Sequence, residues 1–358
     1  MKLQILKKWK GFIAGVAIII FMKIFISNPL RVEKYYSTGM YPFISKALRV
    51  LFGWLPFSAG DLFYMLAAVL LIATVFKTFR QYRFTLKAFG IFFKKIILIL
   101  LWVYILFNFL WGLNYYRTGF QSQLNIKPET YTVQDLEAFS QALITKLNDS
   151  RFLITEYEIK DSSYKIVFDN AIKSYKKTSL QFPFLTYKYR SVKPSMFNTT
   201  GNYLGFLGYY NPFTGEAQVN TKTPSFILPF TACHEIGHQL GYGSESEASF
   251  AAYLTAMASG NKVFEYSSYF ELFIFANQQL FFTDSNLARK NFLQLDTLVK
   301  KDIHQYQYYL AAYNNPLEPF ITSLYGSYLK ANNQPKGMQS YNEVLAWVIA
   351  YHKKYGHL

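Results

Sequence analysis

The sequence has very little of the material from which several classes of protein are built. Cys233 is the only cysteine among 358 residues, which excludes a disulfide framework and a multi-cysteine metal cluster. Charged residues make up only 16% of the chain, whereas hydrophobic residues make up 51% and aromatic residues 20%. That balance excludes an intrinsically disordered chain, because such chains are rich in charge and poor in aromatic residues.

Acidic residues are nearly missing from the first third of the chain. Residues 1–114 contain 15 Lys and Arg but only two Asp and Glu, whereas residues 115–358 contain 22 and 19. The formal net charge of +16 therefore lies mostly on the N-terminal third, which is also the most apolar part. A nucleic-acid-binding protein would carry its basic residues on a folded surface. The pattern instead predicts a lipid bilayer as a partner and no nucleic acid.

Residues 1–114 are predicted to be a membrane domain. Its three apolar runs are each expected to form a transmembrane helix, at about 11–26, 62–79 and 96–113. The first run begins like a secretory signal peptide, but bulky Phe25, Ile26 and Leu30 stand where cleavage would need small residues. We therefore expect an uncleaved helix.

The distribution of Lys and Arg beside the three runs predicts their orientation. The N-terminal tail has four basic residues and no acid, and the 77–95 loop has six and no acid. The 27–61 loop has four basic residues together with two acids. Because the more basic flanks stay in the cytoplasm, we expect a cytoplasmic N-terminus and a C-terminal domain outside the cytoplasmic membrane, in the periplasm or the extracellular space.

Residues 115–358 are predicted to form one mostly helical domain with a small β region, so the fold class is mainly α. Apolar residues recur at helical spacing in four segments: 132–148, 163–177, 295–313 and 340–355. The 185–222 stretch instead contains Gly, Pro, β-branched and aromatic residues typical of strands and turns. Within it, Glu216–Asn220 alternates as a strand. Such a strand either holds an extended peptide or belongs to a simple hairpin.

One short motif, His234-Glu235-x-x-His238, has the residue types and spacing of a catalytic metal site. His234 and His238 are one turn apart on a predicted helix, so their imidazoles face the same way and are able to hold one Zn²⁺. Glu235 leans toward the same side, where it is placed to take a proton from water at the metal. With five His and 13 Glu in the chain, chance would produce this pattern about 0.0025 times. Cys233 lies about 100° round the helix from His234 and is expected to be a small buried thiol.

A catalytic zinc site needs a third protein ligand, and two glutamates follow the motif after a predicted turn at Gly241 and Gly243. Glu247 aligns with an inward-facing apolar stripe, where a carboxylate needs a buried partner such as a metal. Alternatively, Glu247 completes a capping box with Ser244. Glu245 is the second candidate ligand, or a solvated acid of the first helical turn. We predict Glu247 as the third ligand. Tyr209 and Tyr210 are weaker candidates for oxyanion stabilisation.

His234-Glu235-x-x-His238 followed by Glu247-Ala-x-x-Phe resembles the gluzincin-type zinc metallopeptidases. More narrowly, the chain resembles an uncharacterised family of bacterial membrane-anchored proteins through the 56–61, 111–117 and 211–220 stretches and the HExxH region. The resemblance implies a zincin-like domain with His234, His238 and Glu247 as ligands and Glu235 as the base. Ser249 departs from the gluzincin pattern, in which Asn is expected.

These observations lead to two hypotheses of different classes. The first is a membrane-anchored zinc metallopeptidase that hydrolyses a peptide or protein substrate, with Glu235 as general base. The alternative is a non-catalytic, zinc-dependent membrane receptor or sensor, although a purely structural site would not require Glu235. A transporter fits less well, because the three runs contain no internal charged pair that would line a path.

Overall fold

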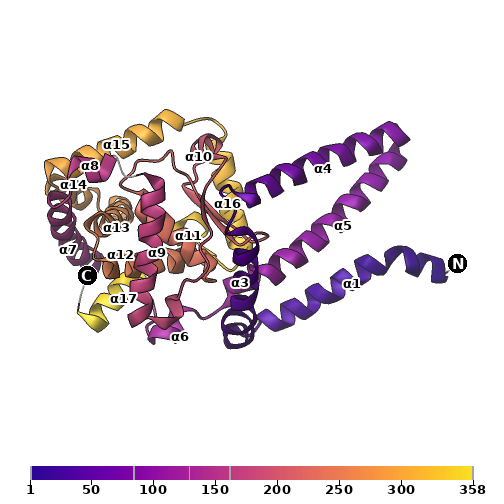
Figure 1. Cartoon of the computed structure of the whole chain (residues 1–358), viewed down its shortest axis with the longest axis horizontal. Helices are drawn as coiled ribbons and strands as arrows, with labels where there is room; N and C mark the ends of the chain where they lie inside the picture. The colour runs from indigo at the N-terminus through magenta and orange to yellow at the C-terminus, as the bar shows by residue number, and fades with distance from the viewer. Residues whose placement is uncertain (1, 84, 129, 161–162, 357–358) are drawn as a thin grey trace.

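Three long apolar helices extend from one side of a globular body (Figure 1). In this computed structural model, which describes residues 2–83, 85–128, 130–160 and 163–356, they are α1 (Lys2–Ile26), α4 (Ala59–Tyr82) and α5 (Leu86–Leu110). Each contains a stretch long and apolar enough to cross a membrane. Large apolar side chains stay exposed along all three helices, as expected where the surrounding solvent is lipid. The predicted membrane helices are therefore confirmed as candidate spans.

The bounds of the third span differ from the predicted run at 96–113. Thr85 caps α5 by accepting a hydrogen bond from the Ala88 backbone N–H at 3.3 Å, so the helix begins well before residue 96 and includes the basic residues ahead of the apolar run. The helix ends at Leu110, because the chain then tightens into the 3₁₀-helix η2 (Gly112–Tyr116), whose first residues are buried against the globular body.

The segment between α1 and α4 packs on the globular body. It consists of α2 (Pro29–Arg31), the π-helix η1 (Val32–Met40) and α3 (Tyr41–Phe52). The hydroxyl of Tyr41 donates to the carbonyl oxygen of Gln239 at 2.9 Å, and Ser45 Oγ donates to the same oxygen at 2.9 Å. The N-terminus and the α4–α5 turn lie at the far end of the three helices (Figure 1). The 27–61 segment and the C-terminal domain thus share one end of the spans.

The globular body is mostly helical, as predicted. Its helices after η2 are α6 (Phe120–Leu124), α7 (Val133–Phe152), α8 (Glu156–Lys160), α9 (Tyr164–Gln181), η3 (Pro183–Leu185), α10 (Asn198–Leu204), α11 (Leu228–Gln239), α12 (Glu245–Ser259), α13 (Lys262–Thr283), α14 (Ser285–Leu293), α15 (Thr297–Tyr313), α16 (Glu318–Ala331), η4 (Gly337–Ser340) and α17 (Val344–Tyr355). The four helical segments expected from periodicity correspond to α7, α9, α15 and α17. Capping residues fix where helices begin. At the start of α7, for example, Thr132 and Asp135 form a capping box.

A three-stranded sheet forms the small β region. Its order is β1 (Val192–Pro194), β3 (Glu216–Val219), β2 (Gly208–Asn211), with β1 parallel and β2 antiparallel to β3. The predicted strand at 216–220 is therefore the central strand, and β2 forms one outer edge. Sheet and helices enclose a core in which α11 is buried along its whole length between the sheet, α9, α12 and α13.

Candidate metal centre

The two histidines of α11 lie side by side in the core. Pro229 near the first turn pre-sets the helical backbone, and the 3.6-residue repeat then places His234 and His238 one turn apart. Their rings lie 4.7 Å apart between centroids and are nearly perpendicular. Both residues are buried, at 7% and 6% exposure.

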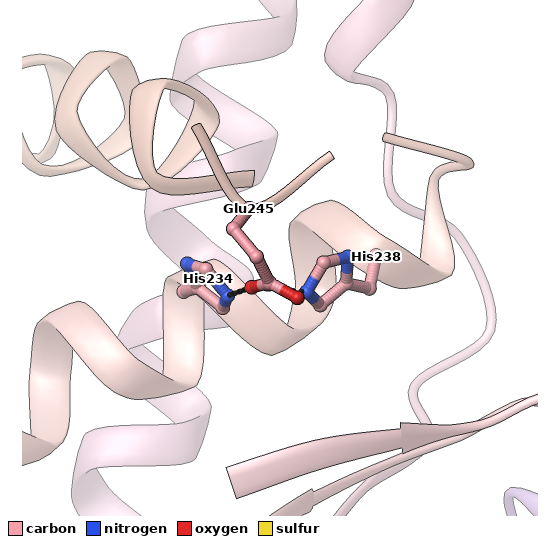
Figure 2. Close-up of side chains that lie close together, drawn as sticks. All are labelled: His234, His238 and Glu245. Carbon is pink, nitrogen blue, oxygen red and sulfur yellow. Dashed lines mark hydrogen bonds and ion pairs between the residues drawn. The ribbon is translucent and has the colours of Figure 1, made fainter. Parts of the chain in front are cut away.

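Glu245, the first residue of α12, lies between the two imidazoles (Figure 2). Its Oε2 atom is 3.2 Å from Nε2 of His234 and 3.4 Å from Nε2 of His238. Two atoms bound to one tetrahedral Zn²⁺ at about 2.0–2.1 Å would be about 3.3 Å apart. One ligand atom from each residue lies within 4.8 Å of the others. The donor set and its spacing therefore fit a metal ion.

A reversal of the chain after α11 brings Glu245 to this position. Gly241 has φ +88°, a left-handed conformation that glycine adopts without strain, and an added Cβ would lie 2.8 Å from the Tyr41 ring. Two distant residues then hold Glu245: its Oε1 accepts from the Tyr325 hydroxyl at 2.9 Å, and its backbone N–H donates to Gln334 Oε1 at 3.0 Å.

The outer nitrogen of each imidazole has its own partner, which directs Nε2 toward Glu245. His238 Nδ1 lies 2.7 Å from the carbonyl oxygen of Tyr242, and His234 Nδ1 lies 3.0 Å from Ser249 Oγ. Such partners fix the tautomer and orientation of metal-binding histidines. Ser249, which departs from the gluzincin pattern, thus makes a direct contact with His234.

Electrostatics at the site favour an ionised Glu245. Burial opposes ionisation, but the charge of His238 and hydrogen bonds with both imidazoles hold the pKa of the Glu245 carboxyl well below its usual range. Burial alone would also lower the pKa of His238, yet the adjacent Glu245 raises it to about 9. Burial lowers the pKa of His234. Without a metal, the ionised Glu245 carboxylate is thus paired with the two imidazoles, of which His238 carries the proton that a metal ion would replace.

Glu247 does not lie with the histidines, which corrects the predicted third ligand. Its Oε1 accepts from the backbone N–H of Phe120 at 2.9 Å, and its own N–H donates to Ser244 Oγ at 3.2 Å. Of the capping box predicted as the alternative, one half is observed, the hydrogen bond from the Glu247 backbone N–H to Ser244 Oγ, while Glu247 Oε1 accepts from Phe120 instead of completing the box. Glu247 is buried, as its alignment with the inward-facing apolar stripe predicted. It lies near Arg117, however, and not beside the two histidines. Burial raises the pKa of Glu247.

Glu235 points into the cleft beside the histidines. Its Oε2 atom is buried and has no hydrogen-bond partner among the described residues. Gly208 of β2 lies against this carboxylate, since a Cβ there would be 2.6 Å from Glu235 Oε1. Burial raises the pKa of Glu235 to about 8, and the charge of Glu245 adds to this effect while His238 opposes it. An unpaired buried carboxylate is unfavourable without a cation or proton donor nearby.

A cleft of about 640 Å³ opens beside His234 and Glu235. Most of its wall is apolar or aromatic. It is lined by Tyr64 of α4, residues of α10 and β2, Phe230, Glu271 and Phe275, and side chains of α15, α16 and η4. The cleft therefore meets both the candidate metal centre and the first turns of a membrane helix.

The other residues considered from sequence have different positions. Tyr209 lines the cleft and bonds to Asp61 at the start of α4. Tyr210 is instead buried in an apolar cluster with Tyr41 and Trp111, and its hydroxyl oxygen lies 3.4 Å from that of Tyr41. Cys233 is a free, buried thiol, as predicted. Tyr325 and Tyr341 near Glu245 had no distinguishing signal among 30 tyrosines.

Fold and site together define a mainly α protein with three candidate membrane helices and a buried His–His–Glu cluster beside a cleft. A family model described as "Protein of unknown function (DUF3810)" matches residues 36–349. Because that match spans most of the chain and every residue of the candidate centre, the chain belongs to this family. The expected membership of an uncharacterised family is confirmed. No curated protein and no solved structure matches the chain.

Proposed function

We propose that the protein is a membrane-anchored zinc metallopeptidase. His234, His238 and Glu245 would hold the metal, and Glu235 would be the general base. Two histidines and one glutamate are a donor set of catalytic zinc sites, which keep one position open for water or substrate. The observation that carries the proposal is the unpaired Glu235 carboxylate, which faces the cleft beside a closely spaced donor set.

Zinc at this position would supply a Lewis acid that polarises a carbonyl group and makes water more acidic. Glu235 is placed to accept the proton of the attacking water and to pass it to the leaving amine. The Tyr341 phenol lines the same cleft and lies near Glu235 and Glu245, which makes it the candidate for donating a hydrogen bond to the developing oxyanion.

The outer strand β2 supports a peptide as the substrate. Among the described residues it pairs with one strand, β3, on one side, and its first residues, Gly208 and Tyr209, line the cleft beside Glu235. An extended peptide added to this free edge would gain backbone hydrogen bonds and run past the candidate metal centre.

The experiment that tests the proposal compares two substitutions in the purified full-length protein. Glu235→Gln should retain about one zinc per chain, because Glu235 is not a ligand, while peptide hydrolysis falls by about 10²–10⁴-fold. His234→Ala should lose the zinc. Zinc content and cleavage of a mixed peptide library are the two measurements. Wild-type hydrolysis by Glu235→Gln would overturn the proposal.

The proposed location is the cytoplasmic membrane, with the cleft outside the cytoplasm. Its support is the excess of Lys and Arg in the N-terminal tail and the 77–95 loop, together with the common end shared by the 27–61 segment and the C-terminal domain. A reporter that is active only outside the cytoplasm, fused after residue 358, should be active. Activity only from a cytoplasmic reporter at that position would reverse the orientation.

One contact favours the alternative of a zinc-dependent receptor. Glu216 of the sheet accepts hydrogen bonds from the backbone N–H groups of Ala59 and Gly60, at 3.2 and 2.6 Å, where α4 begins. Tyr209 in the cleft wall bonds to Asp61 one residue further on. A ligand in the cleft would therefore touch a side chain bonded to a membrane helix. Full complementation of a deletion by Glu235→Gln, without complementation by His234→Ala, would favour this role.

A further inference from the structure

A second carboxyl group in the cleft has an oxygen without a hydrogen-bond partner among the described residues, and the proposed hydrolysis gives it no role. Glu271 of α13 lines the same cleft as His234 and Glu235, but it is absent from the His–His–Glu cluster. Its exposure is 5%, and its Oε1 atom has no hydrogen-bond partner among the described residues. A side chain this deeply buried normally has its polar atoms satisfied, so the free oxygen needs an explanation.

Packing between α13 and α11 fixes Glu271 beside the cleft. One turn earlier, Ser267 Oγ accepts a hydrogen bond from the backbone N–H of Phe230 at 3.0 Å. The neighbouring Phe270 packs edge-on against the rings of Phe226 and Tyr306. These contacts leave Glu271 facing the space in front of the N-terminal half of α11, where Phe230 and Thr231 also line the cleft.

The side chains that line the cleft include acidic residues and no lysine or arginine, in contrast to the basic composition of the whole chain. The chain has 37 Lys and Arg against 21 Asp and Glu, yet the residues lining the cleft include three glutamates, Glu235, Glu271 and Glu318, and neither Lys nor Arg. With no cation nearby, burial raises the pKa of Glu271 to about 7. A positively charged group that entered the cleft would favour ionisation of Glu271 and pair with it.

The remaining wall suits the apolar stem of such a group. Several of the residues that line the cleft together with Glu271 are aromatic, among them Phe230, Phe275, Tyr306, Tyr309 and Tyr313. Aromatic faces attract cations and pack against methylene groups. A lysine or arginine side chain has both parts, an apolar stem and a cationic end that an unpaired carboxylate would bind.

We propose that Glu271 determines substrate specificity by binding a cationic nitrogen group of the peptide substrate inside the cleft. This inference rests on the proposed peptidase function. The shared chemistry is an ammonium or guanidinium group, supplied either by a lysine or arginine side chain or by the free amino terminus of the peptide. Glu271 pairs with that group, and the aromatic wall holds the chain that carries it.

The test measures peptide binding without turnover, in the full-length zinc-loaded Glu235→Gln protein in detergent. Three labelled peptides of one length are compared: an acetylated peptide containing lysine, the same acetylated peptide with leucine in its place, and the leucine peptide with a free amino terminus. One of the two cationic peptides should bind at least about tenfold more tightly than the acetylated leucine peptide, since a charge-assisted hydrogen bond is gained. Which of them does so identifies the source of the cation.

Adding Glu271→Gln should abolish that preference and leave binding of the acetylated leucine peptide unchanged. The matched control is Glu265→Gln on the same helix, which removes a carboxylate paired with Lys262 outside the cleft and should keep the preference. Zinc content and thermal unfolding check that each variant is folded. A preference unchanged by Glu271→Gln would overturn the assignment of Glu271 alone. If zinc is held but no peptide binds, the peptidase proposal fails with it.

Discussion

Glu245 and Glu247 lie on the same turn of α12, are both buried, and have opposite surroundings. Glu245 faces two imidazoles and is held ionised by them. Glu247 faces the backbone of Phe120 and the guanidinium of Arg117, in the region that joins the spans to the body. Residues two apart on a helix differ by about 200° in direction, so a single metal cannot bind both. Both side chains are buried, so it is their direction and not their burial that places only Glu245 with the two histidines.

Removing each carboxylate in turn should have very different effects on zinc binding. Glu245→Ala should weaken zinc binding by more than about a hundredfold, because loss of residues that only orient ligands already costs 10–100-fold. Glu247→Gln should change zinc affinity by less than about tenfold, since its amide oxygen still accepts the N–H of Phe120. Competition with a chelator of known affinity measures both values. The reverse order would return the ligand role to Glu247.

Removing the cation beside Glu247 should affect stability instead of metal binding. Arg117 is paired with Glu33 at 2.7 Å, and its side chain is 3% exposed. It also donates to the carbonyl oxygen of Gly241 at 3.0 Å. Arg117→Gln should lower the free energy of unfolding by about 3–5 kcal/mol, because it leaves buried carboxylates without their counter-charge.

Denaturation in detergent checks the expected loss, with Arg190→Gln as the control. Arg190 pairs with Asp169 at the surface, where the two side chains are 63% and 50% exposed, so its removal should cost no more than about 1 kcal/mol. Equal destabilisation by the two variants would contradict the distinction between the buried and the exposed ion pair.

The smallest expected effect concerns the partner of His234. Ser249→Ala removes the hydroxyl 3.0 Å from His234 Nδ1 and leaves all three candidate ligands in place. Zinc affinity should fall by about tenfold, at the lower end of what such outer contacts contribute. Ser246 is on the same turn, and the hydroxyl contact recorded for it among the described residues is with Ser244 Oγ, so Ser246→Ala should leave affinity unchanged. An unchanged affinity in Ser249→Ala would show that other contacts orient the ring.

Much of the architecture follows from local patterns. The apolar runs of the first third predict the candidate spans, because a helix in lipid needs about 20 apolar residues whatever surrounds it. The helices α7, α9, α15 and α17 are predictable from the spacing of their apolar residues. The 27–61 segment is different: its burial on α11 through Tyr41 and Ser45 depends on contacts with residues about 200 positions away, which no local pattern encodes.

The candidate metal centre also has one part that local sequence patterns predict and one part that long-range contacts determine. The common direction of His234 and His238, with Glu235 beside them, is predictable from sequence alone, because helical geometry sets these directions in any context. The place of Glu245 in the cluster depends instead on contacts that are distant in sequence. Its position requires the left-handed turn at Gly241 and the hydrogen bonds from Tyr325 and to Gln334. Long-range partners choose between two nearby glutamates because both fit the local helical pattern equally well.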